Sequence, residues 1–164
     1  MANELLTSWR HAEPNRRNLE DDVNAQRLLC ATDGSPPSEK AVAYAVGLAD
    51  EMRRPITFLL VADGALETAP AVWDEARVKA EDLPPDRELL AALKAALQHN
   101  MLGIRLVRAY GSDPAEAIVG YAERNGYRHI IVGSEGLTGA KRMLLGSVAA
   151  DVVTRAHCPV TVVR

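Results

Sequence analysis

The residues best placed to do chemistry are three glycines and a serine near the C-terminus. Two residues separate Gly133 from Gly136, nine separate Gly136 from Gly146, and Ser147 follows directly. Glycines let backbone N–H groups turn toward an anion because no Cβ obstructs them. Gly146 and Ser147 would begin a helix, whose first amides and dipole favour a negative group. The spacing predicts a phosphate-binding loop; the alternative is a plain strand-to-helix turn in which Ser147 only caps the helix.

Other chemical motifs are absent from the sequence. Neither G-x-x-x-x-G-K-[ST] nor G-x-G-x-x-G occurs. We expect no catalytic residue, because no Ser or Cys is placed to make His129 or His157 a catalytic base. Cys30 and Cys158 lie in separate apolar runs without a second ligand at metal-binding spacing. We therefore expect two reduced thiols and no metal site.

Alternating apolar runs must position the candidate loop. Strand-like runs cover 27–32, 56–62, 104–110, 128–133 and 159–164, with helical patterns over 38–52, 86–101, 112–126 and 147–156. We expect the last helix to turn Val148, Val152 and Ala156 inward. The alternation is typical of a doubly wound, mostly parallel α/β sheet of five strands. In such sheets ligands bind at the carboxyl ends of strands where the strand order reverses, so the turns 31–37 and 132–139 should form one crevice.

Bulk properties limit the function classes. The chain has 164 residues and a net charge of -3, and its basic residues form no run, so we expect no nucleic-acid partner. No apolar run is long enough to span a membrane, so we expect a cytoplasmic protein without membrane contact. Residues 1–25 are polar and without period, which predicts a flexible N-terminal arm, and residues 26–164 form the folded domain.

Two segments carry a family resemblance. "LLCATDGSPPSEKAVAYAVGLA" and "HIIVGSEGLTGAKRMLLGSVAADVVTRAHCPVTVVR" resemble the universal stress protein family, and the second carries the glycine spacing of its ATP-binding branch. The resemblance implies five parallel strands in the order 3-2-1-4-5, as in the adenine nucleotide alpha hydrolase-like fold. It also implies ATP, with Mg²⁺, in the switch-point crevice. The residues expected to bind it are Thr32, Asp33, Val61, Gly133, Ser134, Gly136, Gly146, Ser147 and Val148.

One position departs from that pattern. The residue after Ser134 is commonly basic in the family, and here it is Glu135, which would repel a triphosphate unless it points to solvent or shares a divalent cation. Lys141 and Arg142 could supply compensating charge. The favoured function is a regulatory, ATP-binding stress protein with little or slow hydrolysis. The alternatives are a true ATPase or phosphotransferase, and an interaction module that no longer binds nucleotide.

The C-terminal run suggests an assembly. Pro159–Arg164 follows the last helix, so it should lie at a sheet edge, and Val160, Val162 and Val163 offer no charge that would discourage pairing. Together with the family resemblance, this predicts a homodimer paired through the terminal strand. The alternative is an edge covered by the N-terminal arm.

Overall fold

The computed structural model describes residues 27–101, 103–135 and 145–164. The predicted arm, residues 1–25, lies outside the described residues. Gly136, Lys141 and Arg142 of the predicted glycine loop also lie outside them.

Five parallel strands form the centre of the molecule in the predicted order. They are β1 (Leu28–Ala31), β2 (Ile56–Ala62), β4 (Ile104–Tyr110), β5 (His129–Gly133) and β6 (Val160–Val163). Their spatial order is β4-β2-β1-β5-β6, and each adjacent pair is parallel. The chain order reverses at β1, which lies between β2 and β5. The order expected from the resemblance, 3-2-1-4-5, is therefore confirmed.

The prediction of five strands is wrong in number, because a sixth strand extends the sheet. β3 (Ala71–Trp73) pairs antiparallel with β4 and is followed by the short helix α3 (Glu75–Lys79). The Trp73 side chain is buried, and the guanidinium groups of Arg77 and Arg108 lie 5.3 and 5.8 Å from its ring. Arg108 also pairs with Asp86 at 2.5 Å. These contacts fix a segment for which the sequence predicted neither a strand nor a helix.

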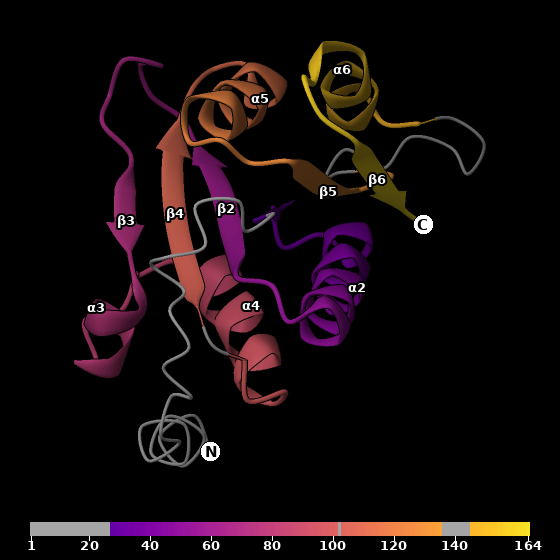
Figure 1. Ribbon diagram of the computed structural model, residues 1–164. Coiled ribbons are helices and arrows are strands. Elements are labelled where there is room, and N and C mark those ends of the chain that lie inside the picture. The colour runs from indigo at the N-terminus through magenta and orange to yellow at the C-terminus, as the bar shows by residue number, and fades with distance from the viewer. Residues whose placement is uncertain (1–26, 102, 136–144) are drawn as a thin grey trace.

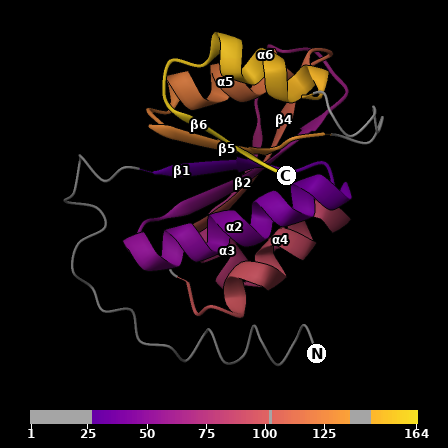
Figure 2. The same ribbon diagram turned by 90° about the vertical axis from the view of Figure 1, so that its right-hand side faces the viewer.

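Helices cover both faces of the sheet. α2 (Pro36–Met52) and α4 (Arg87–Leu97) lie on one face, and α5 (Pro114–Arg124) and α6 (Ser147–Arg155) lie on the other (Figures 1 and 2). Leucines repeat every four residues along α4 and face the core, since Leu89, Leu93 and Leu97 are all buried. None of the described helices is both long and apolar enough to cross a membrane.

The two cysteines are not joined by a disulfide. Cys30 is buried in β1 and Cys158 is partly buried before β6. Burial raises the pKa of the Cys30 thiol to about 12, so this group stays protonated at neutral pH.

Candidate functional site

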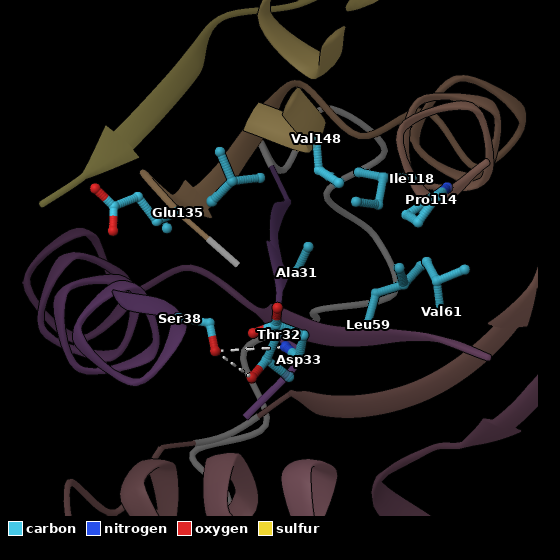
Figure 3. A pocket seen from close by; sticks show the side chains of 12 residues that line it. Ala31, Thr32, Asp33, Ser38, Leu59, Val61, Pro114, Ile118, Glu135 and Val148 are labelled. Atoms are coloured by element: carbon cyan, nitrogen blue, oxygen red, sulfur yellow. Dashed lines mark hydrogen bonds between the residues drawn. The ribbon is translucent and has the colours of Figure 1, made fainter. Parts of the chain in front are cut away.

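A pocket opens at the carboxyl ends of β1, β2 and β5, where the strand order reverses. Its volume is about 260 Å³, slightly below the roughly 300–1,000 Å³ of ordinary small-molecule sites. Figure 3 shows side chains from both helix layers directed toward it. This is the crevice in which open α/β sheets hold ligands. The lining residues are Ala31, Thr32, Asp33, Ser38, Leu59, Val61, Pro114, Ile118, Val132, Gly133, Glu135 and Val148.

One wall of the pocket is apolar. Leu59 and Val61 come from the end of β2, and Pro114 and Ile118 come from the first turn and a half of α5. Figure 3 shows these four side chains grouped on one side of the pocket. A flat heteroaromatic ring could lie against this wall, because burial of its faces against apolar side chains is favourable. The aliphatic side chains have no hydrogen-bonding groups that the ring would leave unpaired.

The loop after β1 forms the polar floor, and local hydrogen bonds hold it. The Asp33 carboxylate accepts the Ser35 N–H at 2.9 Å, which is the side-chain turn that aspartate commonly makes. The hydroxyl groups of Thr32 and Ser38 lie 3.3 Å apart, and the Gly34 N–H donates to Thr32 at 3.4 Å. Thr32, Ser35 and Ser38 are buried. The floor is therefore organised by its own sequence before any ligand binds.

Gly133 is required for packing as well as for the pocket. A Cβ built on Gly133 would lie 2.7 Å from the carbonyl carbon of Pro37 and 2.8 Å from the Ser38 nitrogen. Both are backbone atoms at the start of α2, where Ser35 caps the helix and Pro36 and Pro37 follow. The end of β5 thus approaches the first turn of α2 more closely than any side chain would permit.

Substitution of Gly133 by alanine should therefore destabilise the domain. We expect a loss of about 1–3 kcal/mol in unfolding free energy, because the α2 backbone must shift to admit the methyl group. Gly47 is the matched control, since it lies within α2 and its Cβ would meet nothing within 4 Å. Gly47→Ala should raise stability by about 0.5–1 kcal/mol. Urea unfolding measures both variants, and equal effects of the same sign would contradict the packing argument.

The helix start best suited to an anion is that of α6. Gly146 caps α6 without a side-chain hydrogen bond, and no acidic residue lies in its first turn. In contrast, Asp113 caps α5 with its carboxylate, and Pro36 and Pro37 remove two donors from α2. Because the first amides of α6 have no intrahelical partners, they can donate to a phosphate group.

The structure brings together part of the predicted residue set. Thr32, Asp33, Val61, Gly133 and Val148 line the pocket.

The other predicted residues lie beside the pocket or are not described. The Ser134 carbonyl accepts the Gly146 N–H at 2.8 Å, which joins the end of β5 to the start of α6. Ser147 is the first residue of α6 and is exposed, so the cap is Gly146 and not Ser147. Gly136 lies outside the described residues.

One expectation about α6 is wrong. The helical period placed Val148 toward the core, but its side chain is 37% exposed and faces the pocket mouth, whereas Val152 is buried. The reason is that Val148 lies in the first turn of α6, where its side chain lines the pocket.

Four residues of the pocket wall lie outside the turns and residues that the sequence predicted. They are Ser38, Leu59, Pro114 and Ile118, whereas Ala31 and Val132 lie within the predicted turns 31–37 and 132–139. A signal for two of them was present, because Pro114 and Ile118 are four residues apart at the start of the helix that follows a parallel strand. Such helix starts line the same edge of the sheet as the strand ends.

A family model and a curated relative both match this chain to the same family. The sequence model described as the Universal stress protein family matches residues 24–164. The chain is 34% identical over 150 residues to Universal stress protein YxiE of Bacillus subtilis, covering 84% of this chain and 98% of that protein.

Solved structures show the same fold. A universal stress protein in complex with cAMP superposes with a TM-score of 0.60 at 24% identity, covering 85% of this chain and 96% of that one. A universal stress protein from Archaeoglobus fulgidus in complex with dAMP gives a TM-score of 0.57 at 21% identity, covering 84% and 96%.

Proposed function

Because the chain belongs to the universal stress protein family, we propose that it binds an adenine nucleotide in the pocket at the ends of β1, β2 and β5. The observation that carries the proposal is the juxtaposition, within one crevice, of an apolar wall and a helix start whose cap makes no side-chain hydrogen bond. ATP, accompanied by Mg²⁺, is the ligand that the glycine spacing favours. The protein then acts as a regulatory, nucleotide-binding stress protein.

The pocket offers a distinct place for each part of such a ligand. The adenine ring lies against Leu59, Val61 and Ile118, and the phosphates lie toward the start of α6. Thr32 and Ser38 place hydroxyl groups on the floor between these ends, where a ribose would meet them. Two structures of the same fold contain cAMP and dAMP, which supports an adenine ligand here.

We further propose that bound nucleotide is hydrolysed slowly or not at all. Fast nucleoside triphosphatases position an attacking water and hold Mg²⁺ with a dedicated Ser or Thr and an acidic residue. Asp33, the acidic residue on the floor, already accepts the Ser35 amide in its local turn. Single-turnover hydrolysis on the purified protein distinguishes this function from a true ATPase or phosphotransferase.

Native mass spectrometry of the freshly purified protein tests the proposed function. We expect a mass shift that matches an adenine nucleotide, and calorimetry on the stripped protein should show saturable binding. A protein that carries no nucleotide and gives no saturable binding with any adenine ligand would be an interaction module instead.

The proposed setting is a homodimer in the cytoplasm. β6 forms one edge of the sheet, which leaves its outer backbone groups available for a second copy. The two free thiols suit a reducing compartment.

A further inference from the structure

The sheet has a second edge besides β6. This edge is formed by β3, on the opposite side of the sheet from β6 (Figure 1). An edge strand carries a row of N–H and C=O groups that can pair with a further strand. An open β3 edge would therefore accept a second copy of the chain or an extended peptide.

Val72 is the residue of β3 whose backbone groups point outward. The Gly111 N–H donates to the Ala62 carbonyl oxygen of β2 at 3.1 Å, so odd-numbered residues of β4 face β2 and even-numbered residues face β3. The residues of β3 that lie opposite even-numbered positions are Ala71 and Trp73. The N–H and C=O groups of Val72, between these two residues, therefore point away from the sheet.

Arg77 covers this outward-facing position. Its Nη1 donates to the Val72 carbonyl oxygen at 2.6 Å, and its Nε donates to the Asp82 carboxylate at 2.5 Å. The guanidinium carbon also lies 5.3 Å from the centre of the Trp73 ring. Three contacts of one side chain thus hold the guanidinium group against the strand edge.

The positions two residues before and after Val72 also offer little to a further strand. Pro70 has no N–H group that could donate. The Asp74 carbonyl oxygen accepts the Val78 N–H at 3.0 Å, at the start of α3, and the Asp74 carboxylate accepts the Arg77 N–H. The β3 edge therefore presents only part of the backbone row that strand pairing needs.

We infer that Arg77 closes the β3 edge of the sheet, so that neither an extended peptide nor a second copy adds a strand there. β6 is then the sheet edge left for association, and pairing of two copies through it ends at a dimer instead of continuing into longer assemblies. The inference goes beyond the proposed function, because it does not depend on whether a nucleotide binds.

Light scattering over a concentration series of the full-length protein tests the inference. Arg77→Ala removes the guanidinium group, and Arg77→Met removes it while keeping an apolar stem beside Trp73. Both variants should show at least about a twofold rise in average mass over the wild type at about 100 micromolar, because the Val72 carbonyl group becomes available. Arg87→Ala is the matched control, since Arg87 is an exposed arginine of α4 outside β3 and α3, and it should leave the mass unchanged.

A second substitution shows whether the new association runs through β3. Val72→Pro removes the outward-facing N–H, which the sheet does not use and which an edge strand can lose. Added to Arg77→Ala, it should restore the wild-type mass, whereas a general loss of stability would not be reversed. Circular dichroism verifies that each variant is folded. Wild-type masses for the folded Arg77 variants, or a rise in mass that Val72→Pro leaves in place, would overturn the inference.

Discussion

An Ala31→Phe variant should lose adenine-nucleotide binding by at least about 100-fold, or roughly 2.7 kcal/mol. Ala31 ends β1, and its methyl group points into the pocket between the floor and the mouth (Figure 3). A phenyl ring at this position would extend into a space of about 260 Å³ that the ligand must also occupy. The variant should fold, because the added ring enters the pocket rather than the close-packed core.

Calorimetry with adenosine and with magnesium-bound ATP measures the effect of Ala31→Phe. Binding of both ligands should be lost, because the phenyl ring occupies the space of the adenosine part that the two ligands share. Ala43→Phe is the control, since Ala43 is an exposed residue of α2 that does not line the pocket, and it should leave both affinities unchanged. Wild-type affinity in a folded Ala31→Phe protein would place the ligand elsewhere on the molecule.

The alternation of strands and helices could be predicted from the sequence for a physical reason, whereas the strand order was implied by the family resemblance. Parallel strands buried on both faces give near-continuous apolar runs, and the turns that follow them must carry polar residues and glycine. The turns at 31–37 and 132–139 stand out for this reason, and both contribute to the pocket. Gly133 was predicted as a phosphate-binding glycine, which stays a prediction; the structure shows a different need for glycine there, the close contact with the Pro37 backbone.

The missed features depend on contacts between distant segments. β3 is three residues long, too short for a recognisable alternation, and its position depends on Trp73, Arg77 and Arg108, which only the folded chain brings together. From the sequence alone, Ile118 and Leu59 cannot be distinguished from ordinary core residues, because their side chains are apolar whether they face a helix or a ligand. Periodicity identifies a buried face, but it cannot tell that part of this face lies beside an open pocket.

The terminal strand has the geometry that pairing with a second copy would need. β6 is hydrogen-bonded to β5 on one side and forms the edge of the sheet. The carbonyl groups of Pro159 and Val163 accept the N–H groups of Ile130 and Ser134, so residues 159, 161 and 163 face β5. The backbone groups of Val160 and Val162 therefore point outward, where an antiparallel copy about a two-fold axis could pair with them.

A Val162→Lys variant should therefore be monomeric at concentrations at which the wild type is dimeric, with at least about a 100-fold weaker association. A two-fold contact would bring the two introduced charges close together, and like charges that face each other across paired strands are destabilising.

A second variant is needed because the Val162 side chain also packs against the core, where a lysine could disturb the fold. Val162→Pro keeps an apolar side chain, removes the outward-facing N–H and is tolerated at a sheet edge. Light scattering measures the mass, and circular dichroism verifies the fold. Val153→Lys is the control, because Val153 is 48% exposed on α6 and is not part of the strand, and it should leave the dimer intact. A wild type that is monomeric at tens of micromolar, or folded Val162 variants that stay dimeric, would rule out pairing through β6.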